Sequence, residues 1–308
     1  MAKQYTMEKS NTIVISLIIP VFNPPDSFFK LLTDLSLQKI DVAYEMIIVD
    51  DCSLSDGLSR IKKHLDTLGI SNIKLLRTPK NLGPAAARNL GSAQATGTVL
   101  IFIDSDCRIM ARDHLARLYA AHLRHPHAII GGGVAGFGKG YVAFSDNYCH
   151  WATNIPKIPP TLLASGHLVT AHLLIPLAIW EKVGPFDPSL RTGEDTAFSL
   201  KARLHNIELR LHGNIFLYHH DRESFPMFVK NFYKVGKDRA AVRRSVYERV
   251  PWYLGENKLL RCLLVPLITS GLILKLIITW WPHDKKILFA LPGIFVGMLS
   301  LAIGVANS

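Results

Sequence analysis

Residues 12–22 read TIVISLIIPVF, and Tyr44–Asp50 reads YEMIIVD. The first run is continuous and rich in β-branched residues, which is typical of a strand buried in a parallel sheet, and the second predicts another strand. Between them, residues 24–38 place apolar side chains at helical spacing. Because strand, helix and strand follow one another in this order, the stretch predicts a βαβ unit and an α/β fold.

The same alternation continues along the first half of the chain. Helices are predicted over residues 56–68 and 84–95, and strands over residues 73–76 and 98–104. Repeated alternation at this spacing predicts a Rossmann-like, mostly parallel sheet with flanking helices and right-handed crossovers.

The middle of the chain is less regular. The glycine-rich residues 129–140 and the proline-bearing residues 154–160 are predicted as loops. Strands are predicted over residues 167–175 and 208–219, and a helix over residues 194–205.

Two apolar runs, residues 263–281 and 287–306, end the chain. Each is near the roughly 20 residues that a membrane-crossing helix needs, so we predict a two-helix transmembrane hairpin. Lys275 interrupts the first run, which leaves open whether that segment spans the membrane or is re-entrant. The alternative is a buried helical hairpin of a soluble domain.

An amphipathic segment precedes the hairpin. Phe225, Phe228, Val229, Phe232 and Tyr233 share one helical face, as in a helix that lies in a membrane interface. The predicted domains are therefore 1–222 (α/β domain), 223–262 (basic interfacial segment) and 263–308 (hairpin). A polar N-terminus without a signal peptide and a basic block over residues 230–249 predict an inner-membrane protein whose α/β domain faces the cytoplasm.

Charge and cysteine content narrow the function classes. The formal net charge is +11, which indicates phosphate-bearing partners. The four cysteines form no C-x-x-C pair, which favours reduced thiols over a zinc site or a disulfide framework. A basic protein that binds nucleic acid would share this charge, but acidic strand ends disfavour contact with a phosphate backbone, so no nucleic-acid partner is expected.

Carboxylates follow two of the predicted strands. Residues 50–53 read DDCS and residues 104–106 read DSD. Ligands bind open α/β sheets at the carboxyl ends of strands, and paired carboxylates there suit Mg²⁺ or Mn²⁺ held together with substrate phosphates. Glu194 and Asp195 open a later helix, where a carboxylate can take a proton from an incoming hydroxyl or can simply balance the helix dipole.

Further polar residues lie at predicted element ends. His219 and His220 end a strand, and either could offer an imidazole to a metal. Asn81, Gly83, Arg88 and Asn89 surround a helix start, where backbone N–H groups and a guanidinium can meet a phosphate. Residues 133–139 (GVAGFGK) nearly match a Walker A loop, but Gly140 replaces the magnesium-binding hydroxyl, which disfavours an ATPase.

The motifs, taken in order, resemble those of the family-2 glycosyltransferases of GT-A fold. They are PVFN at 20–23, DDCS at 50–53, NLG at 81–83 with ARN at 87–89, DSD at 104–106, GPFD at 184–187 and GED at 193–195. The resemblance covers about residues 13–236.

The resemblance implies a role for each matched residue. Asp195 would be the catalytic base of an inverting transfer, supported by Glu194, and Asp106, Asp104 and His219 would bind Mn²⁺ or Mg²⁺. The nucleotide sugar would contact Pro20, Asn23, Asp50, Asp51, Ser53, Asn81, Gly83, Arg88, Asn89 and Asp104.

The predicted activity is metal-dependent transfer of a sugar from a nucleotide-diphosphate sugar to a membrane-associated acceptor in cell-envelope glycan or glycolipid synthesis. The expected partners are the donor, a lipid-linked or glycan acceptor, the membrane, and subunits of an envelope glycan pathway. The main alternative is a polyprenyl-phosphate glycosyltransferase, whose acceptor is a lipid phosphate. A nucleotidyltransferase would need a glycine-rich, lysine-bearing loop after the first strand, where this chain has Asn23-Pro24-Pro25.

Overall fold

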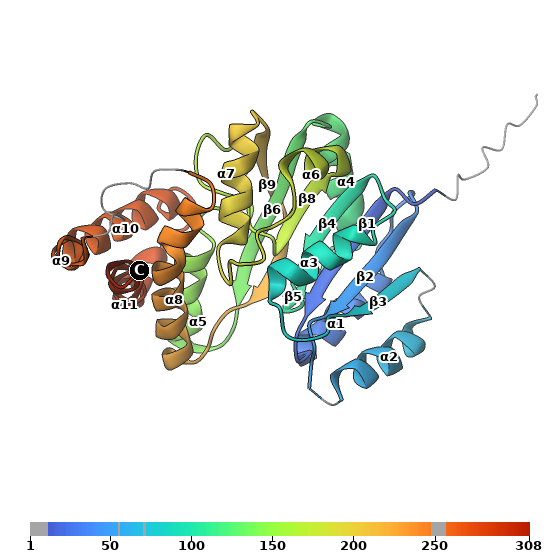
Figure 1. Ribbon diagram of the computed structural model, residues 1–308, viewed down its shortest axis with the longest axis horizontal. Helices are drawn as coiled ribbons and strands as arrows, with labels where there is room; N and C mark the ends of the chain where they lie inside the picture. The colour runs from blue at the N-terminus through green and yellow to red at the C-terminus, as the bar shows by residue number, and fades with distance from the viewer. Residues whose placement is uncertain (1–11, 55, 70–71, 248–256) are drawn as a thin grey trace, which may run out of the picture.

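The computed structural model describes residues 12–54, 56–69, 72–247 and 257–308. Within these residues, nine strands form one sheet in the order β3-β2-β1-β4-β8-β6-β9-β5, with β7 paired to β9. Helices flank the sheet, and α8 to α11 gather at the end of the molecule opposite β3 (Figure 1). The predicted α/β class with flanking helices is confirmed.

The first half of the fold lies within three residues of the predicted bounds. Its elements are β1 (Ile15–Val21), α1 (Asp26–Ser36), β2 (Tyr44–Asp50), α2 (Gly57–Leu68), β3 (Ile73–Arg77), α3 (Pro84–Ala93) and β4 (Val99–Ile103). Along β1, Ile15, Leu17 and Ile19 pack into one core cluster and Ile18 into another. Because successive side chains of a strand point to opposite faces, the uninterrupted apolar run shows that helices cover both faces of β1.

The second half contains β5 (Cys107–Arg108), α4 (His114–Arg124), β6 (Ala128–Phe137), α5 (Gly140–His150), β7 (Thr161–Leu162), β8 (His172–Pro176), α6 (Leu177–Val183), α7 (Glu194–Leu204) and β9 (Glu208–His220). Elements α7 and β9 confirm the prediction, whereas β8 begins five residues later than expected. Helices α4, α5 and α6 and the two-residue strands β5 and β7 were not predicted.

The sheet is mixed, so the predicted parallel pairing holds among β1 to β4 and for β6 with β9, but not for the pairs that β5, β7 and β8 make. The pairs β1–β2, β1–β4, β2–β3 and β6–β9 are parallel. The pairs β4–β8, β6–β8, β5–β9 and β7–β9 are antiparallel. The alternation of strands and helices that predicts parallel pairing ends after β4, and β8 then inserts antiparallel between β4 and β6.

Residues 129–137, predicted as part of a loop, belong to strand β6. The strand also contains most of residues 133–139, the stretch that nearly matches a Walker A loop. Its glycines leave room for neighbouring side chains. A Cβ atom added at Gly132 would lie 1.8 Å from Cε1 of His172, and one at Gly136 would lie 1.7 Å from Oδ2 of Asp221. Glycine is therefore required here by close packing across the sheet, although glycine in isolation predicts a turn.

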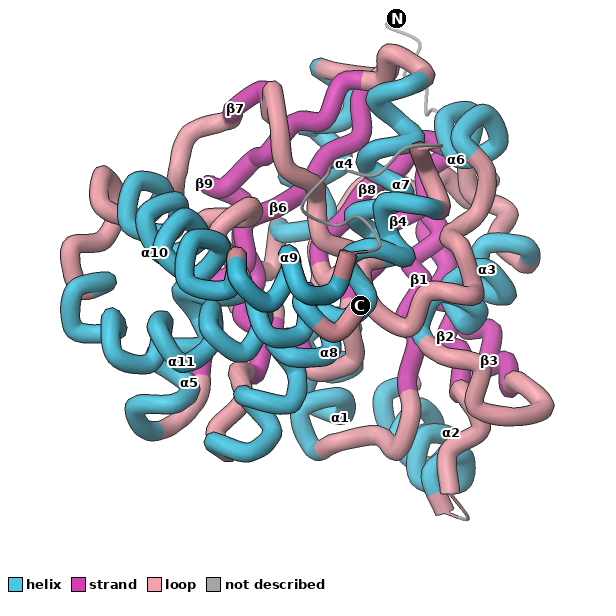
Figure 2. The backbone as a smooth tube through the Cα atoms, turned by 60° about the vertical axis from the view of Figure 1, so that its left-hand side comes forward, coloured by secondary structure: helices cyan, strands magenta, loops and turns pink. Residues whose placement is uncertain are grey.

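The C-terminal elements are α8 (Phe225–Arg244), α9 (Lys258–Leu263), α10 (Val265–Trp280) and α11 (Ile287–Ala306). Helix α11 lies beside α8, α5 and α10 in both views (Figures 1 and 2). Gly236 and Gly304 allow this contact, because a Cβ at either would lie about 2 Å from a carbonyl oxygen of the other helix. The C-terminal helices share the core cluster that lies against the sheet.

Only part of the predicted membrane hairpin has the expected form. Among the described residues, one helix, α11, is long and apolar enough to cross a membrane by length and composition, and half of its apolar window is buried inside the protein. Helix α10 has 16 residues, fewer than the roughly 20 that a span requires. Phe228 and Phe232, expected at a membrane interface, are buried in the protein core. Residues 248–256 of the predicted basic segment lie outside the described residues.

Candidate functional site

A cavity of about 910 Å³ lies over the ends of β1 and β4 and reaches α10 and α11. Its sheet side includes Pro20, Asp51, Asn81, Gly83, Arg88, Asp104, Asp106, Glu194, Asp195 and His219. The carboxyl ends of parallel strands are where open α/β sheets bind ligands. The cavity therefore occupies the edge where the sequence predicts the site and brings together ten of the predicted residues.

Three potential metal ligands meet at this edge. Asp104 and Asp106 follow β4, and the pairing of β5 with β9 places Cys107 opposite His219. One ligand atom from each of Asp104, Asp106 and His219 lies within 4.8 Å of the others. Successive strand residues point to opposite faces, so His220 turns away and is 46% exposed beside Glu223. Of the two candidate histidines, His219 is the one in the cluster.

The donor set of this cluster fits a hard or borderline divalent cation such as Mg²⁺ or Mn²⁺. His219 Nε2 lies 3.1 Å from Oδ1 of Asp106. Burial opposes a charge on His219, but Asp106, Asp104 and Asp221 outweigh burial and raise the pKa of His219 to about 8. The same negative field that favours a proton there favours a metal cation.

Arg88 joins the two halves of the site. Its guanidinium is almost fully buried and donates to Asp104 and, over 2.7 Å, to Oε1 of Glu194. The sequence predicts that this cation meets a phosphate, whereas the structure gives it two carboxylate partners. Arg88 therefore holds Asp104 beside the metal cluster and fixes Glu194 at the start of α7.

Glu194 and Asp195 differ in their hydrogen bonds. Glu194 is held by Arg88 and by Thr170, whereas Asp195 accepts at Oδ1 from the backbone nitrogen of Thr196 at 2.6 Å. Within the described residues no hydrogen bond is made to Oδ2 of Asp195. Burial raises the pKa of Asp195, and burial against the opposing effect of Arg88 raises the pKa of Glu194 to about 6. A carboxylate with a raised pKa and a free oxygen is suited to accept a proton near neutral pH.

The loop before α3 is organised by Asp51. The backbone nitrogens of Leu82 and Gly83 donate to the Asp51 carboxylate at 2.9 and 2.7 Å, and Thr78 Oγ1 donates at 2.8 Å. Gly83 has a φ of 92°, which a residue with a side chain rarely adopts. The N–H groups of Leu82 and Gly83, which belong to the loop predicted to face a phosphate, thus bind Asp51, and this holds the loop against β2.

Four predicted site residues do not line the cavity. Asp50 is buried against Arg77, and Ser53 accepts a hydrogen bond from the backbone of Asn23. Asn23 in turn accepts from the nitrogen of Leu54. Asn89 forms two hydrogen bonds with the backbone of Phe186, which fastens the GPFD segment to α3. These side chains bind neighbouring loops and strands and do not face the cavity.

Sequence reasoning missed Arg222, which also lines the cavity. Its guanidinium lies 3.2 Å from Oδ2 of the buried Asp146 on α5. Burial alone would raise the pKa of Asp146, but His150 and Arg222 outweigh it and lower that pKa to about 2. The sequence offered one indication, because Arg222 follows the predicted metal ligand His219 by three residues. Only the fold shows that Asp146 holds Arg222 at the cavity.

The family model for glycosyl transferase family 2 matches residues 16–171, about half of the chain, and the protein belongs to this family. It is 27% identical over 249 residues to glycosyltransferase AglE of Haloferax volcanii, covering 78% of this chain and 80% of that protein. The predicted recognition as a family-2 glycosyltransferase of GT-A fold is confirmed.

Solved structures share the fold. The mannosyltransferase PcManGT of Pyrobaculum calidifontis, in complex with GDP-Man and Mn²⁺, aligns with a TM-score of 0.64 at 15% identity, covering 99% of this chain and 90% of that chain. Residues 1–349 of TarS from S. aureus, in complex with UDP, align with a TM-score of 0.57 at 19% identity, covering 94% and 90%. At these identities the likeness shows a shared fold.

Proposed function

We propose that the protein is a metal-dependent, inverting glycosyltransferase that moves a sugar from a nucleotide-diphosphate sugar to a membrane-associated acceptor in cell-envelope glycan or glycolipid synthesis. The observation that carries the proposal is the placement of the cluster of Asp104, Asp106 and His219 in the same cavity as Asp195. A nucleotide-sugar transfer needs both a cation site for the diphosphate and a base for the acceptor.

Each part of the cavity has a task in this proposal. Asp104, Asp106 and His219 hold Mn²⁺ or Mg²⁺, which when bound would neutralise charge on the departing diphosphate. Arg88 keeps Asp104 in place through a buried ion pair. Asp195 accepts the proton of the acceptor hydroxyl at its free Oδ2, on the side of the sugar opposite the leaving group, which gives inversion.

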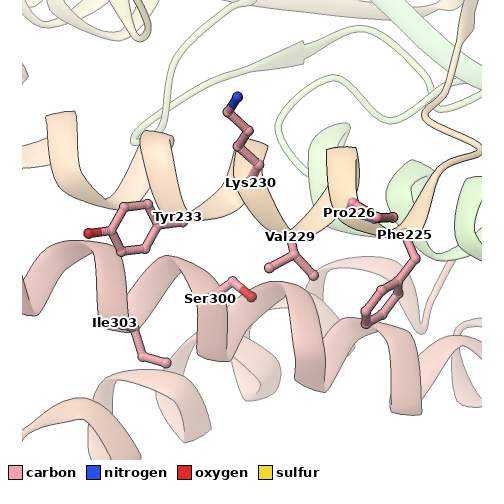
Figure 3. Close-up of a pocket in the computed structure, with 7 residues that line it drawn as sticks. All are labelled: Phe225, Pro226, Val229, Lys230, Tyr233, Ser300 and Ile303. Carbon is pink, nitrogen blue, oxygen red and sulfur yellow. The ribbon is translucent and has the colours of Figure 1, made fainter.

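The surface of the C-terminal helices supports a membrane-associated acceptor. On α10 and α11 the exposed large apolar residues are Leu267, Leu274, Ile278, Leu288, Phe289, Phe295 and Ile303. A second hollow of about 490 Å³ lies between α8 and α11, where Val229 and Phe225 face α11 and Lys230 points away (Figure 3). Exposed apolar surface of this extent is typical of contact with a membrane. The proposed location is the inner membrane, with the catalytic part facing the cytoplasm.

The helix side of the cavity favours a second candidate, a polyprenyl-phosphate glycosyltransferase. Lys234, Arg239, Arg243 and Lys275 line this side. A lipid phosphate is already ionised at neutral pH, so transfer to it requires no base. Asp195 then distinguishes the two candidates, because it is needed for a hydroxyl acceptor and dispensable for a phosphate acceptor.

The proposal is tested by incubating the detergent-purified protein with Mn²⁺ or Mg²⁺ and a panel of nucleotide sugars, with release of the nucleoside diphosphate as the readout. Asp106→Ala and Asp195→Asn are compared with wild type and with Asp66→Asn, which changes an exposed carboxylate on α2. We expect turnover of one donor by wild type and the control, with loss in both site variants.

Two other results have defined meanings. Activity of Asp195→Asn with a lipid-phosphate acceptor would replace the first candidate by the second. Failure of wild type to bind or turn over any donor with either metal would overturn both candidates.

A further inference from the structure

His219 meets the metal cluster with one ring nitrogen and keeps the other inside the protein. Its Nε2 lies 3.1 Å from Oδ1 of Asp106. Its Nδ1 is buried and has no hydrogen-bond partner among the residues that the structure describes. Buried polar atoms without a partner are rare in folded proteins. The groups packed behind the ring therefore decide what Nδ1 can bind.

A buried carboxylate lies next to this nitrogen. Asp221 follows β9, is 2% exposed and is not among the residues that line the cavity. Its Oδ1 lies 3.9 Å from Nδ1 of His219. A hydrogen bond is shorter, roughly 2.7–3.2 Å, so a shift of the ring by about 1 Å would form one. In the described part of the chain no other carboxylate pairs with Nδ1.

Trp151 and Gly136 hold this carboxylate in place. Trp151, which follows α5, donates from Nε1 to Oδ1 of Asp221 at 3.0 Å. The Trp151 ring also packs on His219, with 4.6 Å between the ring centroids. Gly136 on β6 leaves room for the carboxylate, because a Cβ atom there would lie 1.7 Å from Oδ2 of Asp221. The indole thus contacts both side chains and keeps Asp221 beside His219.

A cation bound at Nε2 of His219 determines where the ring proton lies. A neutral imidazole has one N–H group, and a metal binds the nitrogen that carries no proton. A cation shared by Nε2 and Asp106 therefore requires the proton on Nδ1. Histidine ligands generally donate this second N–H to an acceptor, which fixes the ring orientation and makes the ring a stronger ligand.

We propose that Asp221 is a positioning residue for the metal centre, which accepts a hydrogen bond from Nδ1–H of His219 and keeps Nε2 directed at the cation. Trp151 holds the carboxylate in this role. The inference rests on the proposed function, because it takes Asp104, Asp106 and His219 as the cation site. It gives a task to a buried carboxylate that none of the sequence motifs contains.

Binding of Mn²⁺ alone to the full chain in a non-ionic detergent tests this assignment, with free Mn²⁺ followed by electron paramagnetic resonance. Asp221→Asn keeps an acceptor for Trp151 and removes the charge. Loss of a residue that orients a metal ligand typically lowers metal affinity about 10–100-fold, and we expect a loss of this size. The matched control is Glu45→Gln, which changes another buried carboxylate, bound to Ser16 at the other end of β1 and β2. It should bind Mn²⁺ as wild type does.

A double-mutant cycle distinguishes positioning from a general loss of stability. His219→Phe keeps a ring against Trp151 and removes both ring nitrogens. If Asp221 acts through His219, adding Asp221→Asn to His219→Phe should weaken Mn²⁺ binding by no more than about twofold further. Melting temperatures are measured for all variants.

The outcomes separate this inference from the proposed function. Wild-type Mn²⁺ affinity in Asp221→Asn, with weaker binding by His219→Phe, would overturn the inference and leave the metal site in place. The same loss from Asp221→Asn with and without His219 would show a structural role only, which also overturns it. Wild-type affinity in His219→Phe would remove the cation site on which both proposals rest. The expected changes in Mn²⁺ binding without turnover of any nucleotide sugar would support the inference and count against the proposed function alone.

Discussion

The two halves of the sheet are built from different kinds of contact. In the first half, the pairs among β1 to β4 are all parallel, and these strands present Asp51, Asp104 and Asp106 at one edge. In the second half, β8 pairs antiparallel with β4 and β6, β6 packs through glycines, and β9 supplies His219. The cavity lies where the halves meet, so the first half provides a rigid carboxylate edge and the second decides which groups complete it.

The largest expected effect follows from removing Asp106, which lies beside His219 where the two halves of the sheet meet. Asp106→Ala should lower kcat/KM for nucleotide-sugar turnover at least about 100-fold, as loss of one group that stabilises charge in a transition state commonly does. Chelation of divalent cations should have a similar effect on wild type. Initial rates of diphosphate release measure both. Wild-type activity of Asp106→Ala would show that the other carboxylates of the first half are sufficient without Asp106.

Removal of Arg88 tests the buried link between the halves. Arg88→Met leaves Asp104 and Glu194 facing each other without their shared cation, and breaking a buried ion pair in this way costs about 3–5 kcal/mol of unfolding free energy. Arg60→Met, which removes an exposed pair with Asp26, should cost less than about 1 kcal/mol. Urea unfolding followed by circular dichroism measures the difference. Equal stability of the two variants would show that the halves are held together elsewhere.

Gly132→Ala tests the close packing of β6 against β8 in the second half of the sheet. The added methyl group would meet the ring of His172 and force β6 and β8 apart, with an expected cost of about 1–3 kcal/mol. Gly271→Ala on α10 is the matched control, because nothing lies within 4 Å of its Cβ position and alanine favours a helix. The melting temperature should fall in the first variant and hold or rise in the second. A fall in both would point to a general intolerance of substitution.

The smallest expected effect is a dependence of stability on pH. Burial lowers the pKa of His172 to about 4, well below the roughly 6.5 of an exposed histidine. Between these values the unfolded chain binds more protons than the folded one, so stability is full above pH 6.5 and falls as the pH drops toward 4. The loss from this residue is about 1.4 kcal/mol at pH 5.5. Thermal unfolding of His172→Gln between pH 5 and 8 should show a shallower dependence than wild type, and an identical dependence would assign the effect to other groups.

Prediction from sequence succeeded where local pattern and burial agree. The apolar runs of β1, β2 and β4 give their strands to within three residues, since both faces of each strand are covered. Prediction failed at β6. Its glycines indicate a turn when only the local sequence is considered, but in the fold they leave room for the side chains of His172 and Asp221. The role of Arg88 as a phosphate ligand stays a prediction. The sequence did not indicate its two carboxylate partners, Asp104 and Glu194, because the fold brings them to Arg88 from other elements.

Short motifs and hydrophobic periodicity were enough to predict the α/β class, the carboxylates at strand ends and the resemblance to the glycosyltransferase family. The pairing of His219 rather than His220 with Asp106, the contact of Asn89 with the GPFD segment, and the place of Lys275 at the lining of the cavity became clear from the tertiary structure alone. The physical reason is that strand register and helix packing bring together residues far apart in the chain, and a local pattern does not specify those partners.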